Sequence, residues 1–235
     1  MSVVRVEHVY KEYKLGNQTV QALQDISMVV APGRFLAIAG PSGSGKTTLL
    51  NLIGCIDTPT KGDIFIGEEM VSRKTPDELA DLRARTLGFV FQTFNLLPVL
   101  TAWENVEYPM LQRRDLGKKE RQERVKQYLE IVGLGGKMRH RPNELSGGQR
   151  QRVAIARALA GGPSIILADE PTANLDSKTG ESILALMKQI NESEKTTFIF
   201  STHDFRIMEM ADRVVSVADG RLVVERGLHT QGMHG

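Results

Sequence analysis

Residues Gly40–Thr47, GPSGSGKT, have the composition and spacing of a phosphate-binding loop. Glycines at such a turn let backbone amides surround phosphate oxygens, and Lys46 would reach the β and γ phosphates of a nucleotide. Thr47 would add a hydroxyl ligand for Mg²⁺. A glycine-rich turn that only caps a helix is the alternative. The context favours phosphate binding, because the apolar strand 35–39 precedes the loop and an apolar helix, TTLLNLIG, follows it.

A second chemical element is the pair of adjacent carboxylates that ends the apolar stretch SIILADE, residues 164–170. We expect Asp169 to lie on the Mg²⁺ side, with water between them. Glu170, one residue beyond the strand, is suited to act as general base on an attacking water. Adjacent carboxylates at this place can also cap the next helix, so the pair gains its meaning from the phosphate loop.

Two further side chains stand where strands end. Gln92 follows the strand 87–91, and His203 follows the strand 196–201. An amide at the first position could touch a metal or water, and an imidazole at the second could reach a γ-phosphate. Taken alone, each is as well explained as an ordinary loop residue.

The stretch NELSGGQRQRVAIARALA, residues 143–160, predicts a helix with an unusual start. Ser146 can cap it, and Gln149 completes a capping box. Gly147 and Gly148 occupy the first turn, where each disfavours helix relative to alanine by up to about 1 kcal/mol. Bare amides at a helix N-terminus nevertheless form an anion site. The chain therefore carries two segments suited to phosphate.

The elements that must position these residues alternate between strands and helices. Helix signals occur at 177–191 and 204–211 and almost throughout 93–160; strand signals occur at 3–9, 20–30, 35–39, 62–66, 87–91, 164–168, 196–201, 213–217 and 221–224. Apolar strands alternating with helices predict an α/β fold whose parallel sheet is covered on both faces. We interpret the helical middle as an inserted subdomain.

Composition narrows the class of protein. The 235 residues are 41% hydrophobic and 25% charged, with a net charge of +2 that is spread along the chain. This pattern indicates neither nucleic acid nor an anionic membrane surface as partner. No apolar run is long enough to span a bilayer, and charges interrupt the place of a signal peptide. The single cysteine, Cys55, favours a reducing compartment. We expect a cytosolic domain.

In their order along the chain, these motifs resemble those of the ATP-binding cassette (ABC) ATPases. The set comprises the phosphate loop, Gln92, LSGGQ at 145–149, the Asp-Glu pair, ANLD at 173–176 and His203. The resemblance implies a P-loop NTPase core with an N-terminal antiparallel β subdomain and an inserted α-helical subdomain. We assign 1–92 and 161–226 to the core with its β subdomain, 93–160 to the helical signature subdomain, and 227–235 to a mobile tail.

The resemblance further implies ATP and Mg²⁺ as cofactors and a head-to-tail homodimer in which the signature helix of one subunit completes the ATP site of the other. Catalysis would fall to Lys46, Gln92, Glu170 and His203, and metal binding to Thr47, Gln92 and Asp169. Adenine would stack on Tyr13, with Tyr10 as the alternative. The residues expected to contact the nucleotide are Tyr13, Gly40, Pro41, Ser42, Gly43, Ser44, Gly45, Lys46, Thr47, Thr48, Ser146, Gly147, Gly148, Gln149 and Asp176. Asn174 and Asp176 would lie in the loop that crosses the dimer interface.

Longer stretches, among them FVFQTFNLLPVLTAWENVEYP and ADEPTANLDSKTG, resemble the branch that holds the macrolide-exporter and lipoprotein-release ATPases. That branch implies a separate membrane permease with a large extracytoplasmic domain and a peripheral location at the cytoplasmic face of the inner membrane. Part of the stretch after Gln92 would form a groove for a permease helix, through Leu96, Leu97, Val99, Leu100 and Trp103. The alternative places these residues in the core of the helical subdomain.

Two other functions fit the sequence less well. A soluble cassette acting on DNA or ribosomes would resemble relatives with long coiled-coil insertions or two cassettes, and the sequence has neither. A small-molecule phosphotransferase would leave LSGGQ and His203 without roles. His229 and His234, near the C-terminus, lack partners at metal-ligand spacing.

Overall fold

The computed structural model describes residues 2–16, 18–75 and 77–227 of the chain. Its larger sheet has six strands in the order β10-β9-β3-β8-β7-β6. These strands are β3 (Phe35–Ala39), β6 (Leu87–Val90), β7 (Ile165–Asp169), β8 (Thr197–Thr202), β9 (Arg213–Ala218) and β10 (Arg221–Gly227). All neighbours pair in parallel except β10, which runs antiparallel to β9. The predicted parallel α/β fold is confirmed.

The second sheet is antiparallel and is formed by strands within residues 4–70. Its order is β2-β1-β4-β5, with β1 (Val4–Leu15), β2 (Gln18–Val30), β4 (Lys61–Ile66) and β5 (Glu69–Met70). The first two strands are longer than the sequence predicted, because both continue past the buried positions into an exposed hairpin. An N-terminal antiparallel sheet beside a P-loop core is the arrangement that the motifs implied.

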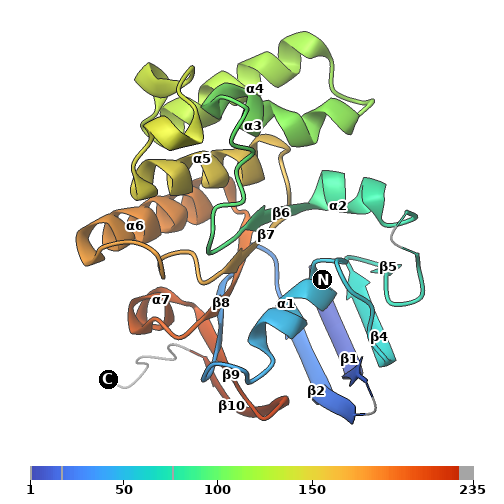
Figure 1. Cartoon of the computed structure of the whole chain (residues 1–235). Coiled ribbons are helices and arrows are strands. Elements are labelled where there is room, and N and C mark those ends of the chain that lie inside the picture. The colour runs from blue at the N-terminus through green and yellow to red at the C-terminus, as the bar shows by residue number, and fades with distance from the viewer. Residues whose placement is uncertain (1, 17, 76, 228–235) are drawn as a thin grey trace, which may run out of the picture.

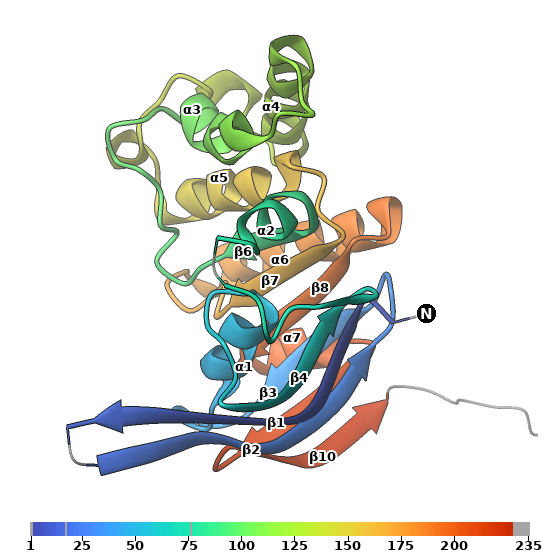
Figure 2. The same ribbon diagram turned by 90° about the vertical axis from the view of Figure 1, so that its right-hand side faces the viewer.

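The helices lie partly at the opposite end of the molecule from β1, β2 and β10 and partly beside the sheets, as Figures 1 and 2 show from two sides. They are α1 (Lys46–Ile53), α2 (Ala80–Thr86), α3 (Ala102–Glu107), α4 (Lys118–Ile131), α5 (Gly147–Ala160), α6 (Ser177–Glu194) and α7 (Phe205–Met210), with the 3-10 helices η1 (Tyr108–Gln112), η2 (Gly135–Lys137) and η3 (Pro142–Glu144). Helices α3, α4 and α5 form the far end. Helix α1, which directly follows the phosphate loop in the chain, lies between the two sheets.

The larger sheet separates two hydrophobic cores, because successive side chains of a strand point to opposite faces. On β3, Phe35 and Ala37 belong to the core shared with α3, α4, α5 and α6. Leu36 and Ile38 belong to the other core, which α1 and the antiparallel sheet complete. The strand is buried on both faces, which explains why its sequence is continuously apolar.

Three differences from the sequence prediction have physical reasons. Helix α2 was missed, because ADLRART offers no apolar periodicity and none of its residues is fully buried. Residues 93–100, which open the stretch 93–160 predicted to be helical almost throughout, form no helix; Thr101 caps α3 and Pro98 precedes it. Gly227, placed in the predicted tail, belongs to β10, and the rest of that tail, with His229 and His234, lies outside the described residues.

Two further properties of the described residues concern their helices and Cys55. None of their helices combines the length and the apolarity that crossing a membrane would need. Cys55 is buried and makes no disulfide, and burial raises the pKa of its thiol to about 11. The thiol is therefore protonated and inert near neutral pH.

Helix α5 approaches β6 so closely that only glycine fits between them. A Cβ built on Gly88 would lie 2.5 Å from the carbonyl oxygen of Ala158 and 2.5 Å from Cδ1 of Ile166. The first of these atoms belongs to the backbone and cannot rotate away. Gly88 thus sets how near the predicted signature helix lies to the sheet.

We predict that Gly88→Ala lowers the free energy of unfolding by about 1–3 kcal/mol, the usual range for overpacking a filled core. Gly136→Ala is the matched control, since a Cβ there meets nothing within 4 Å; its effect should stay within about 0.5 kcal/mol. Urea titration followed by circular dichroism measures both. Equal stability of the two variants would contradict the close approach.

Candidate functional site

A cleft of about 660 Å³ opens where the phosphate loop meets the ends of β7 and β8. Parallel strands place their carboxyl ends at the same edge of a sheet, which is where α/β proteins bind ligands. The lining residues are Val20, Gln21, Ala22, Pro41, Ser42, Gly43, Gly45, Lys46, Thr47, Thr48, Gln92, Asp169, Glu170 and His203. Every residue predicted for catalysis or metal binding therefore lines one cleft. Of the predicted loop contacts, Gly40 and Ser44 do not line it.

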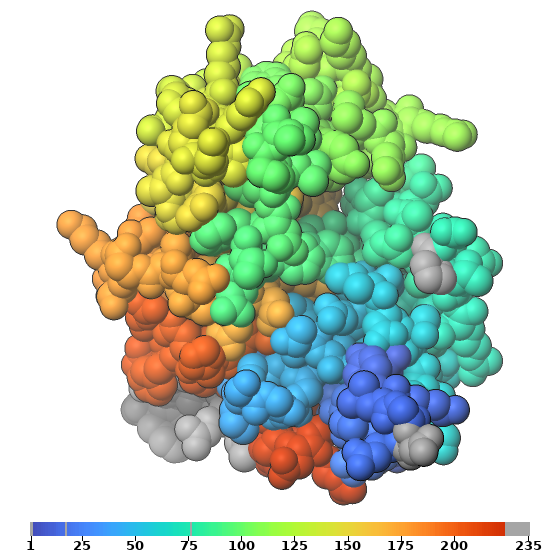
Figure 3. Space-filling model, viewed as in Figure 1, coloured from blue at the N-terminus to red at the C-terminus, as the bar shows by residue number. Residues whose placement is uncertain are grey.

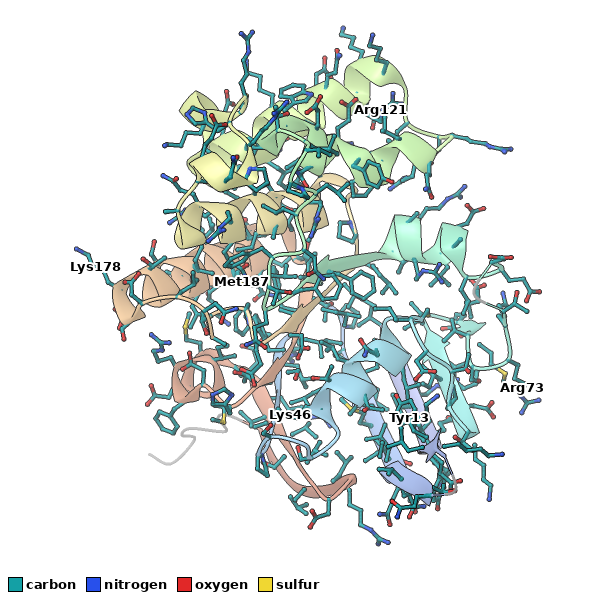
Figure 4. The ribbon with its side chains drawn as sticks, viewed as in Figure 1. Tyr13, Lys46, Arg73, Arg121, Lys178 and Met187 are labelled. Atoms are coloured by element: carbon teal, nitrogen blue, oxygen red, sulfur yellow. The ribbon has the colours of Figure 1, made fainter. Side chains whose placement is uncertain are left out.

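The lysine and threonine of the phosphate loop have definite partners. The Nζ of Lys46 donates hydrogen bonds to the carbonyl oxygens of Gly40 and Pro41, each at 2.9 Å, so the loop curls around the ammonium group. The hydroxyl of Thr47 donates to the two carboxylate oxygens of Asp169 at 3.1 and 3.2 Å. The first turn of α1 and the end of β7 thus bring hard oxygen ligands together. Figure 4 shows Lys46 at the start of α1.

Glu170 is held in place from β8. Its backbone amide donates to the carbonyl oxygen of Ser201 at 2.9 Å, and its φ of 44° turns the chain away from the strand. Its carboxylate accepts a hydrogen bond from the hydroxyl of Thr202 at 3.3 Å and lies 2.7 Å from Nδ1 of His203. The Glu170 side chain is 15% exposed and that of His203 70%. A carboxylate fixed in this way at the cleft wall is suited to orient and deprotonate a water.

Thr202 was missed by sequence reasoning, although it connects these groups. Besides donating to Glu170, its hydroxyl accepts a hydrogen bond from the backbone amide of Asp204 at 2.9 Å. Asp204 in turn pairs with Arg206, whose hydrogen bonds lower the pKa of the Asp204 carboxyl. The signal that could have found Thr202 is its place at the end of a buried strand, directly before His203.

Tyr13 does not line the cleft, although it neighbours a residue that does. It pairs across the sheet with Val20, which does line the cleft, and residues directly opposite in an antiparallel pair share a face. Its hydroxyl donates to Oδ2 of Asp57 at 2.8 Å, and the ammonium of Lys11 lies 4.8 Å from its ring centre. Burial, and then the bond to Asp57, raise the pKa of Tyr13. Figure 4 shows the tyrosine on the hairpin side of α1.

Asp57 is a second residue that the sequence did not reveal. Its carboxylate also accepts from Nζ of Lys11 at 2.6 Å and from the amide of Thr58 at 2.7 Å. Burial alone would raise the pKa of Asp57, but the hydrogen bonds from Lys11 and Tyr13 lower it. The carboxylate therefore stays ionised and restrains the Tyr13 ring.

The N-terminus of α5 has the predicted capping box. The Oγ of Ser146 accepts from the amide of Gln149 at 3.3 Å, and Oε1 of Gln149 accepts from the amide of Ser146 at 3.0 Å. The amides of Gly147 and Gly148 have no intrahelical acceptor, since the first turn of a helix offers none. None of these four residues lines the cleft that contains Lys46.

The structure shows a packing reason for glycine at position 148, which the sequence did not suggest. A Cβ there would lie 2.4 Å from Cγ2 of Thr179 in α6, whereas a Cβ on Gly147 would lie 3.6 Å from Leu175. Asp176, predicted as a nucleotide contact, caps α6 by accepting from the amide of Thr179 at 3.0 Å. The hydrogen bonds to Thr179 lower the pKa of Asp176.

The stretch after Gln92 divides between core and surface. Leu96 and Trp103 are half-buried and pack against the core of the helical end, as the alternative interpretation expected. Leu97 is 38% exposed and Val99 72% exposed. Leu97 lines a groove of about 460 Å³, together with residues of α2, β6, η1 and the end of α5. The groove opens between the teal atoms of α2 and the green atoms that follow β6 in Figure 3.

Comparison with known proteins bears on all of these features. Residues 23–173 match the family described as ABC transporter. An uncharacterised ABC transporter ATP-binding protein of Thermotoga maritima is 50% identical over 98% of this chain and 97% of its own length. A macrolide export ATP-binding/permease protein, MacB, of Rhodopirellula baltica is 47% identical over 95% of this chain, which corresponds to 33% of that larger protein.

Solved structures include the ATP-binding cassette MJ0796 as a dimer in a post-hydrolysis state, bound to ADP and Pi. It has a TM-score of 0.89 and 45% identity, with 96% of this chain and 99% of that chain covered. MJ0796, from Methanocaldococcus jannaschii, is itself called an uncharacterised ABC transporter ATP-binding protein. At this identity, the likeness extends beyond the general fold.

The neighbours of the two glycines in α5 generate a prediction. Gly147→Ala should raise the free energy of unfolding by about 0.4–1 kcal/mol, because alanine restricts the unfolded chain and fits here. Gly148→Ala should gain less or lose stability, since Thr179 must rotate. Adding Thr179→Ser, which removes the clashing methyl group, should recover the difference. Thermal unfolding of the three variants measures this, and no recovery would contradict the contact.

Proposed function

This chain belongs to the ABC transporter family and is an ATPase, and we propose that it is the nucleotide-binding subunit that closes as a homodimer around two ATP molecules to drive a membrane permease. One observation carries the proposal. The phosphate loop, the acidic pair and His203 line a single cleft, while the signature residues 146–149 lie outside it at a helix start suited to anions. One copy therefore holds two separated halves of a site.

A second copy supplies the missing half. In the head-to-tail arrangement, the amides of Gly147 and Gly148 would face the γ-phosphate held by the partner's Lys46. MJ0796 is a dimer with ADP and Pi bound, which supports the pairing of two copies when nucleotide is present. Asn174 and Asp176, in the loop before α6, would then lie near the interface.

In the proposed ATP site, some residues of the cleft bind the nucleotide and others catalyse its hydrolysis. Tyr13 and Val20 would contact the base, and the amides of the phosphate loop with Lys46 would hold the phosphates. Glu170, fixed by Thr202 and His203, would take the proton from the attacking water. His203 is mostly exposed and can reach a phosphate while its Nδ1 contacts Glu170.

Mg²⁺ suits the oxygen ligands that this cleft provides. The Thr47 hydroxyl and the Asp169 carboxylate adjoin each other, and Gln92 lines the same cleft. No cluster of three or more His, Cys, Asp or Glu that could cage a metal exists among the described residues. Mg²⁺ keeps several waters and binds through few carboxylates plus substrate phosphates. When bound, it would neutralise charge on the phosphates.

The groove beside α2 is the proposed site for the permease. It is mostly apolar, and its charged lining residues are Arg83 and Arg157, with no carboxylate among the described residues that line it. An amphipathic helix with a carboxylate on its edge would complement it. The name of the MacB relative, a macrolide export ATP-binding/permease protein, supports a permease of the macrolide-exporter type. The lipoprotein-release type and an extracytoplasmic domain of the permease belong to the proposal through the sequence resemblance alone. The chain would then act peripherally, at the cytoplasmic face of the membrane.

We predict that Glu170→Gln slows ATP hydrolysis by about 10²- to 10⁴-fold, the range for loss of a general base. ATP should still bind, because Lys46 and the phosphate loop are unchanged. The closed dimer should then accumulate, and size-exclusion chromatography with Mg-ATP detects it. A variant that stays monomeric with ATP bound would contradict the proposed dimer.

The divided site is tested by mixing two inactive variants. Lys46→Ala removes the cation of one half, and Gly147→Asp puts a negative charge at the other half, where a Cβ has room. Each alone should lose most ATPase activity. In the mixed dimer, one site combines intact Lys46 with an intact signature, so activity should return to about a quarter of the wild type by random pairing. No return of activity, with both variants folded, would show that the signature does not act across subunits.

The groove generates a prediction with two controls. Leu97→Asp should abolish copurification with the permease while ATPase of the isolated chain stays within about twofold, because surface changes rarely disturb folding. Val99→Asp, more exposed and outside the groove, should copurify normally. Leu96→Asp should instead destabilise the fold by more than about 2 kcal/mol, as burying a charge does. If Leu97→Asp still binds the permease, the groove is not the docking site.

A further inference from the structure

The segment that joins Gln92 to α3 is neither helix nor strand, yet it is held in a specific conformation. Phe94 and Asn95 have φ angles of 63° and 47°, in the left-handed region that residues with a side chain rarely adopt. Asparagine tolerates this region, whereas phenylalanine is strained there. Two consecutive residues of this kind need external contacts to keep them in place.

Those contacts come from the signature helix. The guanidinium of Arg157, in the last turn of α5, donates to the carbonyl oxygen of Asn95 at 2.6 Å and to that of Phe94 at 2.8 Å. Arg157 is half-buried, and burial lowers its pKa. Hydrogen bonds from a charged donor in such surroundings are stronger than those between neutral groups.

A second arginine of α5 reinforces the contact. Arg150 lies seven residues before Arg157, two helical turns away on the same face. Its guanidinium carbon is 5.2 Å from the centre of the Phe94 ring. Helix α5 thus contacts both the backbone and the side chain of Phe94. The rise per residue of an α-helix puts the Cα atoms of the two arginines about 10 Å apart along the helix axis.

The rest of the segment is held from α3. Asn105 is 1% exposed. Its side-chain oxygen accepts a hydrogen bond from the amide of Leu97 at 2.8 Å. Its side-chain nitrogen donates to the carbonyl oxygens of Leu97, Leu100 and Thr101 at 3.0–3.1 Å. Residues 94–101 are consequently fastened to helices at both ends. Gln92 has a different anchor, because its carbonyl oxygen accepts from Nδ2 of Asn174 at 2.9 Å.

We propose that Arg157 is a positioning residue that couples the signature helix to Gln92, with Arg150 as its second point of contact. Residues 94–101 are then fixed to α3 and α5, and the position of Gln92 depends on these contacts. Arg157, Asn95 and Leu97 also line the groove proposed for the permease, so a helix bound there would act on this contact directly. The inference rests on the proposed role of Gln92 at the metal or the attacking water.

The test uses hydrogen–deuterium exchange of the full chain without nucleotide. The amides of Asn95, Leu97 and Leu100 have acceptors within the segment or on Asn105, so they report its integrity. Arg157→Met should raise exchange in residues 93–101 about tenfold or more, the factor expected from losing hydrogen bonds of a charged donor. Exchange in α1 should not change. Arg157→Lys, which keeps the charge, should restore part of the protection.

The matched control is Arg152→Met in the same helix. Arg152 donates to the carbonyl oxygen of Val132 and to Ser182, on another side of α5. It should leave exchange in 93–101 unchanged at a similar loss of stability. Equal loosening in both variants, or none in Arg157→Met, would overturn the proposal. Should Arg157→Met not fold, the same comparison is made with Arg157→Lys, at smaller amplitude.

ATPase kinetics supply the second readout. In Arg157→Met, kcat should fall about tenfold while KM for ATP stays within about twofold, because a misplaced catalytic group affects turnover more than binding. Loosening without a fall in kcat would overturn the coupling to Gln92. The exchange experiment needs no ATP, so a failure of the proposed ATP site, seen as an active Glu170→Gln variant, is distinguishable from a failure of this inference.

Discussion

The parallel pairing of β3, β8 and β7 is the constraint on which the rest of the site depends. Ala39 aligns with Thr202, and Asp169 aligns with Ser201, so three strands end at one level. The phosphate loop leaves the first strand, His203 the second and Glu170 the third. Because the register is set by backbone hydrogen bonds in the buried interior, the relative positions of the side chains proposed for catalysis are determined by the sheet rather than by contacts among them.

The features that could be predicted from the sequence are those encoded locally. A short apolar run followed by glycines, carboxylates or a histidine predicts both a buried strand and the reactive side chains at its end. The capping box of α5 lies within four residues. The parallel sheet and the residues of the cleft followed from such signals. Helix α2 did not, since its sequence lacks periodicity. Neither did the specific conformation of residues 93–100, which is set by contacts with Arg157 and Asn105.

Contacts between distant parts of the chain were beyond sequence reasoning for the same reason. The bond from Tyr13 to Asp57, the hydroxyl of Thr202 beneath Glu170 and the methyl group of Thr179 against Gly148 each join residues whose types are unremarkable alone. Helix α5 concentrates such contacts. Besides its arginines, the buried Gln151 donates to the carbonyl oxygen of Pro171 at 2.7 Å, just after the acidic pair. One helix is thereby connected to several parts of the catalytic edge.

The separation of Lys46 from the start of α5 has a consequence for how the rate of ATP hydrolysis depends on the concentration of the protein. If each site is shared between two copies, as proposed, turnover in dilute solution would rise with the square of the protein concentration until the dimer is saturated. A permease that holds two copies side by side would make their encounter intramolecular, at an effective concentration on the order of millimolar for a short tether. Free chains would then hydrolyse little, and consumption of ATP would be confined to places where the membrane partner is present.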